Sequence, residues 1–180
     1  MKSNWRYLHI PKTGGSSFKV NFINAKVHFP MDHLTLYDEK DKCITILRNP
    51  IDQVISRFRS QTEGIEVQFK SWFESESTQN MQTKHLKLRV LDKDPTFKYT
   101  CPITEVEVDN LIKILKKDFF KVMVTEKLDK QMPYLLKKMK VRLSEKHCNI
   151  SKKKYKPTTE EKNLIREKCA LDFKLYNAFK

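Results

Sequence analysis

An uninterrupted apolar run at residues 43–47 (CITIL) places the tightest constraint on how this 180-residue chain folds. The run lacks the polar alternation of a half-exposed strand, so it predicts a strand buried on both faces. Asn49 and Pro50 follow directly and open a predicted helix, whose apolar side carries Ile51, Val54, Ile55 and Phe58. A buried strand that leads into a helix is the building unit of parallel sheets covered by helices.

The same alternation continues along the chain. Further strands are predicted at residues 5–10 and 119–125, and further helices at 16–24, 65–73, 106–115 and 129–140. Thr104 and Glu107 match a capping box, and a terminal helix begins after Pro157 with a stripe of Ile165, Cys169, Tyr176 and Phe179. Residues 78–98 are polar and poorly patterned. We therefore expect a single α/β domain over residues 1–180, with a mainly parallel sheet and flanking helices. Ligands of such sheets bind beyond the carboxyl ends of the strands.

The positive net charge of the chain indicates which kinds of molecule it could bind. The 36 Lys and Arg residues exceed the 22 Asp and Glu residues by 14, and the excess gathers at residues 1–31 and 130–156. Such a field attracts nucleic acid, nucleotides, sulfated or phosphorylated polymers, or an acidic membrane surface, although a solubilising lysine surface has the same composition.

The apolar runs and the cysteines narrow the class of protein. No apolar run reaches the roughly 18 residues of a membrane span, and the N-terminus lacks the apolar stretch of a secretory signal. The expected location is therefore cytoplasmic for the chain as written, and luminal only if a targeting segment was removed. The four cysteines form no CxxC pair, so no metal site is expected.

The segment HIPKTGGSSF (9–18) has the make-up of a phosphate-binding turn between a strand and a helix. Gly14 and Gly15 allow close approach of the backbone to a ligand, and the helix N-terminus favours negative charge. Lys12 adds a positive charge, and hydroxyl donors come from Thr13, Ser16 and Ser17. The order of residues is not that of a Walker A loop, because Lys12 precedes the glycines. The alternative is an ordinary connecting turn.

A second turn follows the buried strand. Arg48 stands at its carboxyl end, where an unpaired charge is costly unless an anion meets it, and Ser56 lies two turns into the next helix. Both could reach one phosphate beside the first turn. A structural arginine that caps a loop would look the same.

Taken together, PKTGGSS and ITILRNPIDQVISRF resemble the Golgi-type carbohydrate sulfotransferases, which include the heparan sulfate 2-O- and 6-O-sulfotransferases and small bacterial and viral relatives. Three further segments continue the resemblance along nearly the whole chain. They are VTEKLD (124–129), DFKLY (172–176) and the less diagnostic NMQT (80–83).

The resemblance implies a P-loop-NTPase-like sulfotransferase fold that binds 3′-phosphoadenosine 5′-phosphosulfate (PAPS) and releases adenosine 3′,5′-bisphosphate, without a metal. Its 5′-phosphosulfate would lie on Pro11, Lys12, Thr13, Gly14, Gly15, Ser16 and Ser17, and its 3′-phosphate on Arg48 and Ser56. Many relatives carry an arginine where this chain has Gln53. The 3′-phosphate would therefore be held by one positive charge fewer here.

Histidines are the candidates for the base that deprotonates the acceptor hydroxyl. His33 is favoured over His28, because in the resembling family the base lies in the interval between the two turns. Lys12 would stabilise the negative charge that develops on the bridging oxygen of PAPS during transfer. His9 is expected to pack within its strand, and His85 and His147 to lie at the surface. Acceptor contacts are predicted for His28, Asn80, Gln82, Lys84 and His85.

The expected function is therefore transfer of a sulfuryl group from PAPS to a hydroxyl acceptor, with a glycan as the expected partner and no nucleic acid. A nucleotide-dependent phosphotransferase and a basic module that binds nucleic acid or another polyanion are the alternatives. The basic run 152–156 either closes over a phosphate, binds an anionic acceptor or forms a solvated loop.

Overall fold

A computed structural model describes residues 5–15, 18, 35–74, 78–96, 100–140 and 155–180. Three parallel strands, β1 (Trp5–Leu8), β2 (Lys42–Leu47) and β3 (Lys121–Val124), form one sheet with β2 in the middle. In register, Leu8 lies opposite Thr45 and Leu47 opposite Val124. The helices are α2 (Pro50–Gln61), α3 (Phe69–Phe73), α4 (Met81–Leu86), α5 (Glu105–Lys117), α6 (Leu128–Met139), α7 (Thr159–Lys168) and α8 (Ala170–Asn177).

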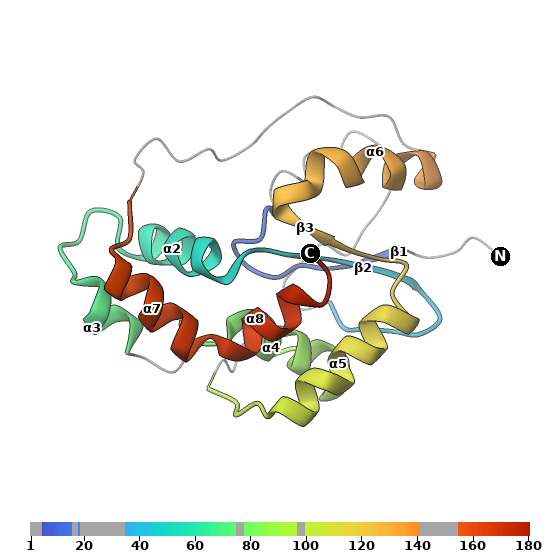
Figure 1. Cartoon of the computed structure of the whole chain (residues 1–180). Helices are drawn as coiled ribbons and strands as arrows, with labels where there is room; N and C mark the ends of the chain where they lie inside the picture. The colour runs from blue at the N-terminus through green and yellow to red at the C-terminus, as the bar shows by residue number, and fades with distance from the viewer. Residues whose placement is uncertain (1–4, 16–17, 19–34, 75–77, 97–99, 141–154) are drawn as a thin grey trace.

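Helices cover both faces of this sheet. Helix α6 lies on one face, and α4, α5 and α8 lie on the other (Figure 1). Alternate residues of β2 serve the two cores: Ile44 and Ile46 pack toward α6, whereas Cys43 and Leu47 pack toward α5 and α8. All four are fully buried. The predicted α/β organisation, with a central strand buried on both faces, is confirmed.

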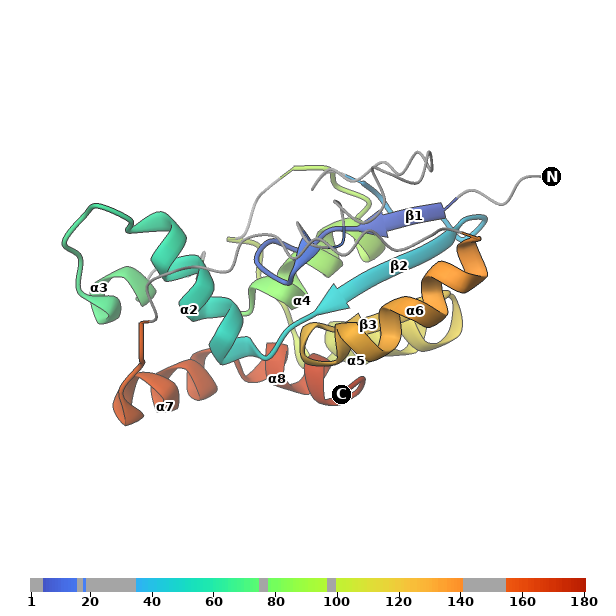
Figure 2. The ribbon, with the colours of Figure 1, turned by 90° about the horizontal axis from the view of Figure 1, so that it is seen from above.

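A third core lies beyond the carboxyl ends of the strands, where α2, α3 and α7 meet. Phe58 of α2 stands at its centre, with ring centroids 5.2 Å from those of Phe69 and Trp72 and 5.3 Å from that of Tyr155. In Figure 2 the strand arrows point toward α2. This core therefore fixes α2 at the edge of the sheet where ligands are expected.

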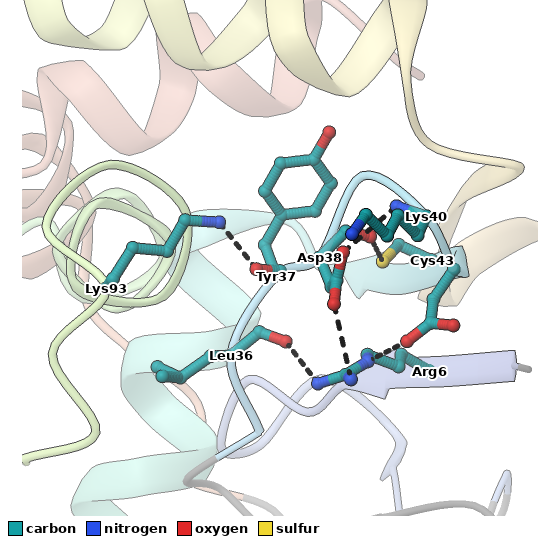
Figure 3. A network of polar contacts seen from close by, with 8 residues as sticks. Arg6, Leu36, Tyr37, Asp38, Lys40, Cys43 and Lys93 are labelled. Atoms are coloured by element: carbon teal, nitrogen blue, oxygen red, sulfur yellow. Dashed lines mark hydrogen bonds and ion pairs between the residues drawn. The ribbon is translucent and has the colours of Figure 1, made fainter.

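A polar network holds the opposite, amino-terminal edge (Figure 3). The Arg6 guanidinium of β1 pairs with Asp41 and with Asp38 and donates to the Leu36 carbonyl oxygen. The Tyr37 ring stacks on Phe119, with centroids 5.4 Å apart, and its hydroxyl donates to Asp118. These contacts attach the segment before β2 to β1 and to the start of β3.

Two helix starts follow the sequence signals closely. Thr104 and Thr158 each accept a hydrogen bond from the N–H three residues on, and the glutamate there bonds back to the cap N–H. The capping box predicted at Thr104 and the helix start predicted after Pro157 are confirmed, and the second start is also a capping box. Of the helix predicted at 16–24, the structure describes Phe18, whose N–H donates to the Gly14 carbonyl oxygen at 3.2 Å.

Two helix predictions need correction. The helix predicted at 65–73 begins only at Phe69, because a turn at Gly64 (φ +81°) leads into an extended stretch where Ile65 is 63% exposed. The single terminal helix is two helices that meet at Cys169. There the Asn80 side chain accepts from the N–H groups of Leu171 and Asp172, and this insertion breaks the helical hydrogen bonding.

The segment 78–98, which has no clear pattern, contains α4 and a π-helical stretch, Lys87–Leu91. Its polar side chains point inward: Gln82, Thr83 and Arg89 are almost completely buried. Hydrophobic periodicity is therefore a poor guide here. No helix in the described parts of the chain has the length and apolar character needed to cross a bilayer.

Candidate functional site

The ends of all three strands meet at one edge of the sheet, where the first turn (residues 9–15), Arg48 and Thr125 lie together. Hydrogen bonds join them directly. The Arg48 guanidinium donates to the Lys12 carbonyl oxygen at 3.1 Å, and the Thr125 hydroxyl lies 2.8 Å from the Thr13 carbonyl oxygen and 3.1 Å from that of Leu47. The sheet thus brings together the two turns that the sequence places 30 residues apart.

Every carbonyl oxygen from residue 10 to residue 13 accepts a hydrogen bond from a side chain. The four donors are Thr13 Oγ1 to Ile10 at 2.8 Å, Gln53 Nε2 to Pro11 at 3.2 Å, Arg48 Nη1 to Lys12 and Thr125 Oγ1 to Thr13. These carbonyl groups therefore face the protein. Through this bond, the Gln53 side chain connects α2 to the turn.

The amide groups of the same turn face the other way. In a trans peptide the N–H lies opposite the preceding carbonyl, so the N–H groups of Lys12 and Gly14 point away from the Gln53 and Thr125 side chains, which hold the carbonyls of Pro11 and Thr13. Neither N–H group has an acceptor among the described residues. Both residues have positive φ angles, 66° at Lys12 and 88° at Gly14. Backbone amides left open in a turn of this kind can bind anions.

Gly15 is required for a steric reason. A Cβ atom at this position would lie 2.0 Å from His9 Nε2. The His9 ring cannot easily withdraw, because it is stacked on the buried Tyr7 ring with centroids 5.4 Å apart. His9 lies one residue beyond β1 and is half-buried, so it packs against the Tyr7 ring rather than within its strand as expected.

The turn also carries positive charge without matching negative charge. Burial, the Arg48 charge and the Arg59 charge together lower the pKa of Lys12. Neither Lys12 nor Arg48 has a carboxylate within ion-pair distance in the part of the chain that the structure describes. Cations brought together in this way are stabilised by a bound anion.

Sequence reasoning overlooked Arg59. The signal that could have found it is its spacing: Arg59 follows Ser56 by three residues in α2, so both lie on neighbouring positions of one helix face.

The backbone of Arg48 is fixed by the side chain of Gln82. The Arg48 N–H donates to Gln82 Oε1, and Gln82 Nε2 donates to the Arg48 carbonyl oxygen, both at 2.9 Å. The next N–H, that of Asn49, donates to Glu126 Oε1 at 2.8 Å. The second turn therefore differs from the first, because its amides are already bonded and only its side chains are available to a ligand.

Helices α4 and α8 cap each other behind Gln82. The Asp172 carboxylate, on α8, accepts from the N–H groups of Gln82 and Thr83 at 3.1 and 2.8 Å and from the Thr83 hydroxyl at 2.9 Å. In return, Asn80 Oδ1 accepts from the N–H groups at the start of α8. Burial raises the pKa of Asp172 to about 6, against the opposing effects of its hydrogen bonds and of the Lys84 charge.

The residues that the sequence singles out for PAPS binding and catalysis, with the other candidate histidines, fall into three groups. Pro11, Lys12, Thr13, Gly14, Gly15 and Arg48 lie together at the edge of the sheet. Ser56 lies in α2, half-buried, one turn beyond Gln53. Ser16, Ser17, His28 and His33 lie outside the described residues, as do His147 and most of the 152–156 run.

Four of the residues for which acceptor contacts are predicted make contacts within the protein or are buried in it. The Asn80 side chain is hydrogen-bonded to α7 and α8. The Gln82 side chain is hydrogen-bonded to the Arg48 backbone. Lys84 is 7% exposed and stands close enough to lower the pKa of Asp172. His85, expected at the surface, is 1% exposed.

No protein-family model matches this chain, and no curated protein is significantly similar to it. Among the described residues, no three His, Cys, Asp or Glu side chains form a group that could hold a metal ion.

We predict that Gly15→Ala destabilises the protein by about 1–3 kcal/mol, because the new methyl group overlaps the His9 ring. His9→Ala removes that ring, so the double variant should be less destabilised than the sum of the two single changes. Urea unfolding of the four proteins measures this coupling. Additive losses would show that the His9–Gly15 contact does not restrict residue 15.

Asp172 gives a prediction on pH. Because its folded pKa of about 6 lies above the usual 3.8, its contribution to stability is fully present below about pH 4 and is lost as the pH rises through 6. The unfolding free energy of the wild type, minus that of Asp172→Asn, should therefore fall by about 2–3 kcal/mol between pH 4 and pH 7. Urea titrations over this range test the sign. A difference that grows with pH would contradict it.

Proposed function

We propose that this protein transfers a sulfuryl group from PAPS to a hydroxyl acceptor, with a carbohydrate as the acceptor class and a P-loop-NTPase-like sulfotransferase fold. The observation that carries the proposal is the first turn, whose four carbonyl groups are bonded to the protein while the amides of Lys12 and Gly14 face away. Lys12 and Arg48 stand beside these amides without acidic partners in the described structure. Such a site suits a ligand with two separate phosphate groups.

The remaining motifs of the resemblance add support through their contacts. Thr125 and Glu126 bond to the first and second turns, and Tyr176 donates to Glu126 at 3.1 Å. Asn80, Gln82 and Asp172 hold Arg48 in the manner described above. Residues from five separate segments thus make one connected structure around the strand ends. A chance likeness in five motifs would not require them to be in contact.

PAPS would supply the sulfuryl group. Separate residues of this chain would bind its two ends and accept the proton of the acceptor. The amides of Lys12 and Gly14 and the Lys12 ammonium suit the 5′-phosphosulfate, where negative charge grows on the bridging oxygen as its bond to sulfur breaks. Arg48 and Ser56 suit the 3′-phosphate, and Arg59 adds the charge that Gln53 lacks. As the acceptor oxygen bonds to sulfur, His33 would take the acceptor proton.

The two other functions have less support. In a nucleotide-dependent phosphotransferase an acidic residue at a strand end commonly holds magnesium, but Glu126 is bonded to Asn49 and Tyr176. A general polyanion-binding module would need only a basic surface. It would leave the ordered carbonyls and amides of the first turn without a purpose.

Label transfer tests the proposal directly. The protein is incubated with PAPS carrying labelled sulfate and a panel of glycans, with Lys12→Ala as the control, which should transfer on the order of 10²-fold less. Adenosine 3′,5′-bisphosphate should also raise the melting temperature more than ATP with magnesium does. No transfer to any glycan, together with a larger shift from ATP, would favour the phosphotransferase.

Arg48 provides a prediction on ligand specificity. Arg48→Ala should weaken binding of adenosine 3′,5′-bisphosphate by about 2–4 kcal/mol, since a charge-assisted contact is lost. Binding of AMP, which lacks the 3′-phosphate, should change little. Isothermal calorimetry measures both, with Arg166→Ala, an exposed arginine of α7, as the matched control. Equal losses for both ligands would make Arg48 a structural residue.

His33 gives a prediction on the chemical step. A neutral imidazole can accept the hydroxyl proton at physiological pH, so His33→Ala should lower turnover about 10²–10⁴-fold and leave bisphosphate binding nearly unchanged. His28→Ala should have little effect on either. If His28→Ala is the inactive variant instead, the base is misassigned although the reaction class stands.

A further inference from the structure

The two backbone N–H groups that follow β2 are each held by a side chain, from Gln82 and from Glu126. Both residues are bonded in turn to α8, Gln82 through its backbone N–H and Glu126 through its carboxylate. Gln82 holds Arg48 and is itself capped by Asp172. Glu126 holds Asn49 with one carboxylate oxygen and accepts the Tyr176 hydroxyl with the other. Asp172 and Tyr176 lie one turn apart on α8. We name these four side chains, Gln82, Glu126, Asp172 and Tyr176, the clamp.

The clamp determines where the Arg48 side chain can reach. With its N–H and carbonyl oxygen both bonded to Gln82, the Arg48 backbone cannot rotate without breaking two hydrogen bonds. One guanidinium nitrogen is bonded to the Lys12 carbonyl oxygen, which sets the distance between the two turns. The Arg48 side chain is thus fixed both at its backbone and at its guanidinium group. Its remaining N–H donors point in one direction, as recognition of a phosphate requires.

The chemistry of the clamp fits this role better than a purely apolar core would. Gln82 and Asp172 are each about 1% exposed, and burial of a carboxylate is costly. The same burial and the adjacent Glu126 raise the pKa of Tyr176 to about 12, so its hydroxyl remains a donor. Buried polar networks that are fully bonded fix one geometry rather than adding stability.

We propose that Gln82 is a positioning residue for Arg48, and that α8 sets the geometry of the 3′-phosphate site through Asp172 and Tyr176. The inference rests on the proposed function for the identity of the ligand. None of the four clamp residues needs to touch that ligand. The sequence resemblance of the NMQT and DFKLY segments thereby acquires a physical role at the second turn.

The test compares two glutamines that make the same kind of bond. Gln82→Met keeps the length of the side chain and removes both bonds to Arg48. Gln131→Met is the control, because Gln131 Oε1 accepts from the Val124 N–H at the end of the neighbouring strand at 3.0 Å. Tyr176→Phe removes only the hydroxyl that reaches Glu126.

Calorimetry should show that Gln82→Met weakens adenosine 3′,5′-bisphosphate at least about tenfold and AMP less than about twofold, as for a binding group that is displaced rather than removed. Gln131→Met should change neither by more than about twofold. A Gln82→Met protein that binds both ligands like the wild type, or loses both equally, would overturn the positioning role.

Amide hydrogen exchange separates this inference from the proposed function, because it needs no ligand. Gln82→Met should speed exchange at Arg48 and Tyr176→Phe at Asn49, whereas Gln131→Met should leave both amides protected. If the wild type binds no bisphosphate, the proposed function fails, and these amides still report on the clamp. Unchanged exchange in both variants would overturn the clamp.

Discussion

Backbone groups at the end of a buried strand must find hydrogen-bond partners where the sheet ends. At the end of β2, this requirement determines how several distant segments pack together. The partners come from α4 and from the segment after β3, and α8 is needed to hold them. The bonds span 34, 77 and 90 residues of sequence. A local structural need of two peptide groups is thus met by segments from three distant parts of the chain.

Much of the architecture could be predicted because it depends on local patterns. The apolar run at 43–47 indicates a strand buried on both faces, and Ile44 and Ile46 on one side and Cys43 and Leu47 on the other bear this out. The capping boxes at Thr104 and Thr158 involve residues three positions apart, so the sequence contains both partners. The Gly14–Gly15 pair likewise marks a turn, since few other residues tolerate such a close backbone approach.

The polar interior could not be predicted in this way. Residues 78–91 look like a surface loop because a helix that buries Gln82, Thr83 and His85 has no apolar stripe. Their partners, Arg48 and Asp172, are far away in sequence, and no local period encodes such bonds. The break at Cys169 has the same origin, since the Asn80 side chain that interrupts the helix comes from another segment. From the sequence alone, polar residues with such distant partners look the same as residues that contact a substrate.

The position of the clamp in the chain imposes an order on biosynthesis. The glycine turn and Arg48 leave the ribosome early, yet Asp172 and Tyr176 follow more than 120 residues later. Until those residues emerge, the peptides after β2 lack their anchors, and the distance between the first turn and Arg48 is not fixed. The geometry at the strand ends is therefore completed in one late step, when α8 docks, rather than growing gradually with chain length.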